Sequence, residues 1–291
     1  FEPAGIDHAS PGSGFDAGDR IIREVFDGTP PVHAAYGMVG LQGSVGKMSG
    51  SSGEAISPNE LLDVYTEPML KWLYLRTLPK RNFSLAFDTE IYRQYDEFDR
   101  DLIAYRAGTL GKAQTFALEE SFADRKDLEG RQRPAPFRQI VSLGQIVQWD
   151  QAKLTKLVRA LGPDYDAGSI KARIPKARNW LEVHNPEEMT ALLAKPNTAY
   201  AKKMTKRNRE LVKELITALK RKKAYEVKEL EDLVYAIPKD PKLDDLANRK
   251  RQRAFFADVY QLLVGQDTGP RLSTFLWAID RAKALKLLGA V

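Results

Sequence analysis

The chain has 291 residues, 43% hydrophobic and 29% charged, which is enough for about two soluble domains with a real core. It has no cysteine, and no apolar run approaches the roughly 20 residues that a membrane helix needs. These counts argue against a membrane-spanning helix, a disulfide framework and a thiolate metal site, and they fit a cytoplasmic protein.

The net charge of +6 is unevenly distributed along the chain. Residues 1–100 hold 9 Lys and Arg against 15 Asp and Glu, whereas the remaining residues hold 36 against 24, a net of +12. Such a division suggests that the second part faces a polyanion, most commonly nucleic acid. Lysine-rich helices that are merely soluble give the same pattern, so charge alone leaves both readings open.

The first fifty residues read as α/β. Apolar residues at helical spacing predict a helix over 16–27, and Gly28 is a fitting end for it. Residues 32–41 then read as a strand that leads into a glycine-rich loop. Beyond the loop, Ser57 and Glu60 form a capping box with proline at the first helical position, which predicts the start of a helix.

From there the chain reads as mostly helical. The polar stretch 128–136, with its glycine and two prolines, is the best linker candidate. Asp150 can cap a helix through Leu161, with Trp149 and Leu154 at staple positions. Further helices are predicted in the second half of the chain, at 185–195, 202–223, 227–236, 244–264 and 271–288.

The most informative stretch is the loop from Gly43 to Gly53, which holds Lys47, Met48 and Ser49. It lacks the spacing of a Walker P-loop. Glycines permit hinge motion, and one cation could close over phosphates. On those grounds alone, an ordinary surface loop is the favoured reading.

In its sequence context this loop resembles the KMSKS signature of class I aminoacyl-tRNA synthetases. The stretches 1–8 and 15–18, which include Asp7 and His8, are similar to the strand-end motif of the class I lysyl enzymes. Further similarity to that family runs through 61–76, 95–100 and 269–276. The resemblance covers the whole chain and is strongest over residues 1–100.

Two departures from the family pattern stand out. Nothing in these residues matches the HIGH motif, which lies on the first half of the family's catalytic fold, so we expect a C-terminal portion of such an enzyme that is inactive alone. Gly50 stands where the signature has its second lysine, which leaves Lys47 as the phosphate-facing cation of the loop.

The resemblance implies ATP-dependent ligation of lysine to its tRNA, with ATP and Mg²⁺ as the expected cofactors. It implies Lys47 as the catalytic cation. Asp7 would accept hydrogen bonds from the ribose of ATP, and His8 and Tyr36 would contact the lysine substrate. The residues expected to bind ATP are Gly5, Asp7, His8, Lys47, Met48 and Ser49. No protein-bound metal site is expected.

For tRNA binding, the first candidate is the basic part of the second half. Its cations fall opposite an apolar face that includes Leu211, Leu215 and Leu219, so they could contact phosphates or simply be solvated. The candidates are Lys202, Lys203, Lys206, Arg207, Lys220, Arg221, Lys222 and Lys223. Phe255, Phe256, Tyr260 and residues 249–253 could hold unstacked bases, although helical spacing places the aromatics in a core first.

We therefore expect a mainly α fold with a small α/β part. Residues 1–53 would form the second half of a Rossmann-like fold, 54–130 a helical region that contacts the tRNA stem, and 131–291 an all-α anticodon-binding helix bundle. Two alternatives remain: a non-catalytic tRNA-binding fragment or paralogue, and a class I synthetase of glutamyl type.

Overall fold

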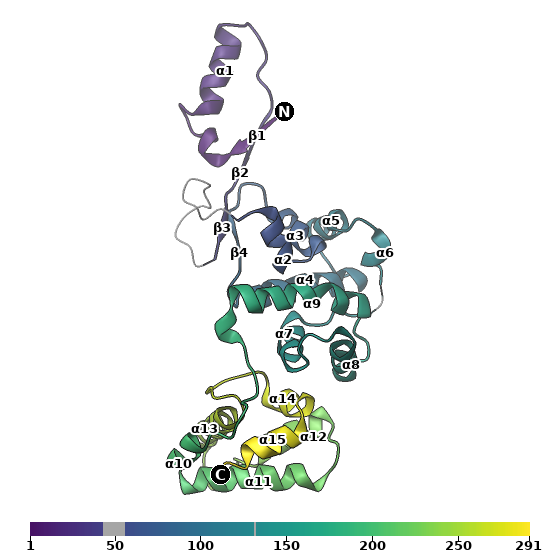
Figure 1. Cartoon of the computed structure of the whole chain (residues 1–291). Helices are drawn as coiled ribbons and strands as arrows, with labels where there is room; N and C mark the ends of the chain where they lie inside the picture. The colour runs from purple at the N-terminus through teal and green to yellow at the C-terminus, as the bar shows by residue number, and fades with distance from the viewer. Residues whose placement is uncertain (43–55, 131) are drawn as a thin grey trace. The chain divides into compact units, whose positions relative to one another are not determined.

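The computed structural model describes residues 1–42, 56–130 and 132–291 (Figure 1). The described residues are mainly helical with a few short strands, as predicted. The chain divides into two units, and neither is continuous in sequence: unit 1 comprises residues 1–137 and 175–185, and unit 2 comprises residues 138–174 and 186–291.

Unit 1 opens with a parallel pair of strands. Strand β1 (Glu2–Gly5) pairs in register with β2 (His33–Tyr36). Parallel neighbours need a crossover connection, and here it contains a 3-10 turn, η1 (Ile6–Ala9), and helix α1 (Gly14–Glu24). The helix predicted over 16–27 therefore begins earlier and ends sooner, and Asp27 beyond it has a positive φ of 45°.

The apolar stripe of α1 is largely exposed. No residue of this helix is buried, and the side chain of Ile21 is 51% exposed. Val25 and Phe26, which follow the helix, are 68% and 73% exposed. The amphipathic pattern therefore forms the expected helix, but its apolar face is covered only in part, by contacts such as that of Phe15 with His33.

The single strand predicted over 32–41 is wrong in one respect: it is broken at Gly37. The chain then pairs elsewhere, because β3 (Val39–Leu41) lies parallel to β4 (Phe83–Leu85). The amide of Gly37 donates to Pro79 O, and Asn82 Oδ1 accepts from the amide of Met38 at 2.7 Å. A Cβ at position 37 would lie 2.5 Å from Arg81 O, so only glycine permits this close crossing.

The rest of unit 1 is helical around an aromatic core. The predicted capping box is confirmed, because Ser57 accepts from the amide of Glu60 and the Glu60 carboxylate accepts from the amide of Ser57. The helices of this part are α2 (Pro58–Val64), α3 (Glu67–Leu75), α4 (Ile91–Arg106), α5 (Lys112–Ser121) and α6 (Arg125–Leu128).

The core of unit 1 joins segments that are far apart in sequence. The rings of Tyr95 and Phe137 stack with centroids 3.9 Å apart. Trp180 is fully buried, and its indole N–H donates to Phe87 O at 2.8 Å. The amide of Asn185 donates to the same oxygen at 2.7 Å. Residues 175–185 therefore complete a core that residues 1–137 begin.

Unit 2 is built from helices, of which α9 continues into unit 1. Its elements are α7 (Phe137–Ile146), α8 (Gln151–Leu161), α9 (Ala167–Asn179), η4 (Pro186–Glu188), α10 (Thr198–Lys203), α11 (Lys206–Arg221), α12 (Val227–Ala236), α13 (Asp245–Leu263), α14 (Leu272–Ala278) and α15 (Arg281–Leu288). After α9 the chain forms a π-helical turn, η3 (Trp180–His184), which belongs to unit 1.

The C-terminal helices enclose a common apolar core. Leu211, Leu215 and Leu219 of α11 are buried, as predicted, together with Phe255 and Val259 of α13. The helix predicted from Asp150 to Leu161 is also confirmed, because the Asp150 carboxylate accepts from the amide of Lys153. The Trp149 ring lies against Gly144, where a Cβ would be 2.1 Å from it.

Three predicted helices of the second half are corrected. Only a 3-10 turn forms over 186–188, because backbone amides that a helix would use are bonded elsewhere, Thr190 N to Gln145 Oε1 and Leu193 N to Leu263 O. The helix predicted over 202–223 is divided after Lys203, since Thr205 caps α11 by accepting from Asn208 N. Likewise Asp280 caps α15 and divides 271–288.

Candidate active site

The carboxyl ends of β1 and β2 lie side by side, because the two strands run parallel with Gly5 opposite Tyr36. Ligands of open α/β sheets bind in the crevice beyond such ends. Asp7 and His8 follow β1 on η1, and Tyr36 is the last residue of β2. The fold thus brings three of the predicted ligand-binding residues to one edge of the sheet.

Glycines set the geometry around Asp7 and His8. A Cβ on Gly5 would lie 2.6 Å from Asp7 Oδ1, so the carboxylate folds back over the strand end only because this position has no side chain. The imidazole of His8 lies against Gly14, where a Cβ would be 3.1 Å from Nδ1. The Ser13 hydroxyl donates to His8 O at 2.6 Å, which ties η1 to the start of α1.

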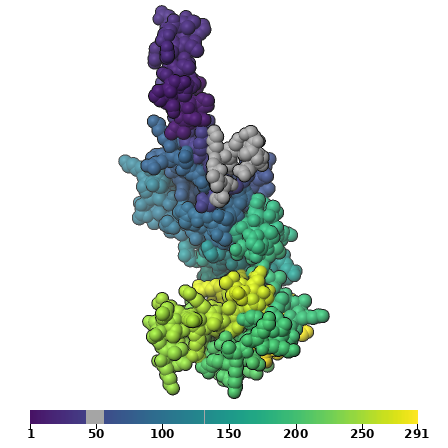
Figure 2. All heavy atoms as spheres, turned by 90° about the vertical axis from the view of Figure 1, so that its left-hand side faces the viewer, coloured from purple at the N-terminus to yellow at the C-terminus, as the bar shows by residue number. Residues whose placement is uncertain are grey.

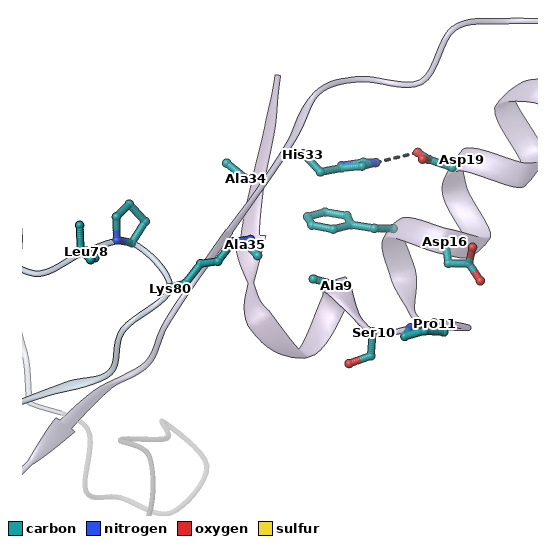
Figure 3. Close-up of a pocket in the computed structure, with 12 residues that line it drawn as sticks. Ala9, Ser10, Pro11, Asp16, Asp19, His33, Ala34, Ala35, Leu78 and Lys80 are labelled. Carbon is teal, nitrogen blue, oxygen red and sulfur yellow. Dashed lines mark hydrogen bonds and ion pairs between the residues drawn. The ribbon is translucent and has the colours of Figure 1, made fainter.

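A hollow of about 820 Å³ lies beside β2 and the end of η1, and its lining does not include Asp7, His8 or Tyr36. Four segments line it: the end of η1, the first turns of α1, β2 and residues 78–80 (Figure 3). The ring of His33 stacks on Phe15 with centroids 3.9 Å apart, and its Nε2 lies 2.6 Å from Asp19 Oδ1. His33 Nδ1 lies 3.6 Å from Glu2 Oε2. His33 therefore links β2 to α1, through its contacts with Phe15 and Asp19.

Lys80 enters the same hollow from the loop before β4 (Figure 3). Asp16 also lines it, and the Asp16 carboxylate accepts from the amide of Gly12 at 2.8 Å. The hollow therefore offers an amine and carboxylates to one ligand. Sequence reasoning missed this lining: Lys80 carries no local signal, since the pairing of β3 with β4 determines where it lies.

The candidates Lys47, Met48 and Ser49 lie outside the described residues. Their flanking residues are described. At the end of β3, the amide of Gln42 donates to Leu85 O at 2.8 Å. On the far side, Ser57 caps α2. The residues on either side of the segment that resembles the signature loop therefore lie at the carboxyl end of β3 and at the start of α2.

Over residues 1–42, 56–130 and 132–291, no group of three or more His, Cys, Asp or Glu side chains could hold a metal ion. Within the described helices, none is long and apolar enough to cross a membrane.

The predicted RNA-binding cations are exposed on unit 2. Lys202 and Lys203 lie on α10, Lys206 and Arg207 begin α11, and residues 220–223 end it or follow it. Two of the cations have acidic partners. Lys222 Nζ lies 2.7 Å from Glu229 Oε2, and Arg207 Nη1 lies 3.7 Å from Glu210 Oε2. Lys222 therefore has less charge to offer a ligand than its exposure suggests.

The two units have net charges of opposite sign. Unit 2 holds 28 Lys and Arg against 17 Asp and Glu, a net of +11, whereas unit 1 holds 17 against 22, a net of −5. A basic unit of this kind attracts polyanions through counterion release, and the attraction falls with salt.

Comparison with known proteins agrees with this picture. Residues 1–121 match the family described as tRNA synthetases class I (K). A lysine–tRNA ligase of Streptomyces coelicolor is 33% identical over 303 aligned positions, which cover 99% of this chain and 52% of the relative. The lysine–tRNA ligases of Pyrococcus horikoshii and Pyrococcus furiosus are 29% and 30% identical, each over 99% of this chain and 55% of the relative.

The chain thus spans about half the length of the curated relatives that it matches. The match to the family covers the strand ends and the glycine-rich loop, and the similarity to the ligases continues through unit 2. The chain is accordingly similar to the class I lysyl-tRNA synthetases, and this similarity supports the interpretation that it matches a C-terminal portion of them.

Proposed function

We propose that this chain supplies one half of the ATP site and the tRNA-binding surface of a class I lysine–tRNA ligase. The observation that carries the proposal is the shared edge of β1 and β2, which gathers Asp7, His8 and Tyr36. The similarity to ligases along the whole chain supports lysine and its tRNA as substrates.

The proposed reaction has two steps. The lysine carboxylate attacks the α-phosphate of ATP and releases pyrophosphate. The lysyl group then passes to a hydroxyl of the terminal ribose of the tRNA. In the first step the protein mainly positions the reactants and stabilises the charge that develops on phosphate oxygens.

In this proposal the strand end binds the nucleotide. Asp7 accepts hydrogen bonds from ribose hydroxyls, and Gly5 leaves room for its carboxylate, as the 2.6 Å approach to a Cβ at that position requires. Lys47 supplies positive charge to the phosphates, while Met48 and Ser49 add contacts from the same loop. Mg²⁺ would accompany ATP as its phosphate-bound counterion.

His8 and Tyr36 are proposed to contact lysine. The Tyr36 side chain is 48% exposed at the end of β2, so a substrate can reach its ring and hydroxyl. An aromatic face attracts a cation such as the lysine ammonium. His8 is exposed on the neighbouring η1, from which it can hydrogen-bond the substrate or the adenylate.

The test is ATP–pyrophosphate exchange dependent on lysine. These 291 residues hold no HIGH motif, so we expect no exchange by the chain alone. Fusing the part of the Streptomyces coelicolor relative that precedes its aligned region ahead of Phe1 should restore exchange with lysine. Exchange with glutamate instead would favour the glutamyl type.

Asp7→Asn in that fusion tests the role of the carboxylate, because it keeps the side-chain shape and removes the charge. We expect its ATP KM to rise while its lysine KM stays unchanged. Clear exchange by the 291 residues alone, or an unchanged ATP KM in Asp7→Asn, would contradict the assigned roles.

A further inference from the structure

Unit 2 carries an aromatic pair at its surface. Tyr235, near the end of α12, is 47% exposed. Its ring meets that of Phe256 on α13 edge to face, with centroids 5.5 Å apart and planes at 87°. Phe256 is only partly buried against the core. An exposed tyrosine held by a second ring is a rigid platform that costs little entropy when a ligand stacks on it.

Three polar residues lie on the same face of α13 as Phe256. Arg249, Gln252 and Arg253 precede it by seven, four and three residues, so all four share a face of this helix. Both arginines are exposed. The face of α13 that carries Phe256 is therefore basic where it is exposed.

The other aromatics that the sequence suggested for base contacts are occupied. Phe255 is fully buried and Tyr260 is 6% exposed, so both belong to the core. In the Tyr235–Phe256 pair, by contrast, one ring remains open to solvent. In Figure 2, atoms from the region near residue 250 lie on the surface of unit 2 that faces the viewer.

Local charge favours an anionic partner. The carboxylates nearest to Tyr235 on α12, Glu231 and Asp232, are engaged by Arg271 and Lys228 respectively. Unit 2 as a whole has a net charge of +11. An unpaired RNA nucleotide joins the two properties required here, because it has an aromatic face and a phosphate.

We propose that Tyr235 and Phe256 form a stacking platform for one unpaired RNA base. Arg249 and Arg253, exposed on the same face of α13 as Phe256, contact the adjacent phosphates. The proposal deepens the proposed function and rests on it, because it names the site at which unit 2 holds a nucleotide of its tRNA.

The test uses the whole 291-residue chain and a hairpin RNA with the anticodon-arm sequence of a lysine-accepting tRNA. Binding is measured by fluorescence anisotropy, with each loop nucleotide replaced in turn by an abasic one. Tyr235→Ala should weaken binding of the intact hairpin about tenfold, as expected for loss of one stacked base. Tyr235→Phe should bind within about twofold of the unchanged chain, since the ring is retained.

Position dependence identifies stacking. One abasic substitution should weaken binding to the unchanged chain by a similar factor and should weaken Tyr235→Ala no further. The slope of log K against log salt should be unchanged in Tyr235→Ala, because no charge is lost. Phe116→Ala is the matched control: it removes an exposed ring, 59% accessible, from the net-negative unit 1 and should bind normally.

Four outcomes would overturn the proposal. Tyr235→Ala could bind as tightly as the unchanged chain, which would leave the proposed function standing without this site. Its loss could be equal for every abasic hairpin, which would exclude a particular base. Tyr235 could instead drive self-association that Tyr235→Ala abolishes, which would make the patch a protein interface. If the unchanged chain binds no RNA, the proposed tRNA contact by unit 2 fails together with this site. Circular dichroism confirms that each variant is folded.

Discussion

Helices α1 and α11 both carry an apolar stripe, but only the stripe of α11 is buried. In α11 the stripe is covered, with Leu211, Val212, Leu215 and Leu219 buried. In α1 no residue is buried. An apolar stripe therefore shows which face of a helix will seek a partner, and it does not show that the partner lies in the same chain.

The strands next to α1 also lack the cover that their faces usually have. A parallel sheet is normally covered on both faces, whereas β1 and β2 form a pair with one short crossover helix. The relatives are nearly twice as long as the aligned region. We expect the remaining residues of a complete enzyme to cover α1, so that unit 1 depends on a complement and the helices of unit 2 do not.

The largest expected effect is a difference in the free energy of unfolding between a substitution in α11 and one beside α1. Leu215 is fully buried, so Leu215→Ala should lower the free energy of unfolding by about 3 kcal/mol. Val25 beside α1 is 68% exposed, and Val25→Ala should change it by less than about 0.5 kcal/mol. Urea unfolding with hydrogen-exchange mass spectrometry measures both. A cost above about 1 kcal/mol for Val25→Ala would mean that its side chain is already covered.

The second prediction concerns rate in the complete enzyme. Lys47→Ala should raise the activation free energy of adenylation by about 3 kcal/mol, since a loop cation that engages phosphates late acts on the transition state. Single-turnover adenylate formation measures this effect. Unchanged kcat with a higher lysine KM would require Lys47 to be reassigned.

The third prediction tests whether the basic unit works within this chain. Binding of tRNA should weaken as salt rises, with a slope of log K against log salt of roughly −3 to −5. Changing Lys220, Arg221, Lys222 and Lys223 to Gln should flatten the slope by about two units, because Lys222 is already engaged by Glu229. Anisotropy titrations at several salt concentrations measure this.

Lys283 and Lys286 on α15, changed to Gln together, provide a control on another exposed helix. The control should leave the slope within about one unit of the unchanged chain. An unchanged slope in the fourfold variant would place the RNA-binding face elsewhere on unit 2.

The smallest expected effects concern pH, and they have opposite signs in the two units. Burial lowers the pKa of His184 in unit 1, although Asp63 and Glu60 act to raise it. Below about pH 6.5 the unfolded state therefore takes up a proton that the folded state resists, so acidification destabilises unit 1. His184→Gln should reduce this loss, as urea unfolding at pH 7 and pH 5 would show.

In unit 2, burial raises the pKa of Asp258, while hydrogen bonds from Tyr200 and Asn208 lower it. The folded state then binds a proton at a higher pH than the unfolded state, so this group stabilises unit 2 as pH falls towards about 4 and loses that contribution as pH rises. Asp258→Asn should remove the contribution. Equal pH slopes in Asp258→Asn and the unchanged chain would contradict it.

Local signals in the sequence predicted local structure well. The capping residues Ser57 and Asp150 and the apolar face of α11 were predicted from spacing alone, and all three are confirmed. The failures came where tertiary bonds compete with local ones. Residues 186–195 have a good helix start. However, Gln145 and Leu263 accept hydrogen bonds from backbone amides of this segment, and a helix would need those amides for its own bonds.

The residues of the candidate site that lie next to a recognisable sequence pattern could be predicted. Those that are placed by strand pairing could not. Asp7 and His8 were predicted because they directly follow a strand and resemble a family motif. His33 and Lys80 reach the hollow through the pairing of β2 with β1 and of β3 with β4, for which the sequence has no short-range signal. The boundaries predicted at residues 53 and 130 remain predictions.

The path of the chain through unit 1 has a consequence for synthesis on the ribosome. Residues 1–137 emerge first, but the place of Trp180 in their core stays empty until 43 further residues have been added. The nascent unit therefore presents an unfilled apolar hole while unit 2 has begun to emerge, and that interval is when a chaperone would find it. A ribosome stalled near residue 140 should yield a protease-sensitive nascent chain, and one stalled after residue 185 has left the exit tunnel should yield a resistant one.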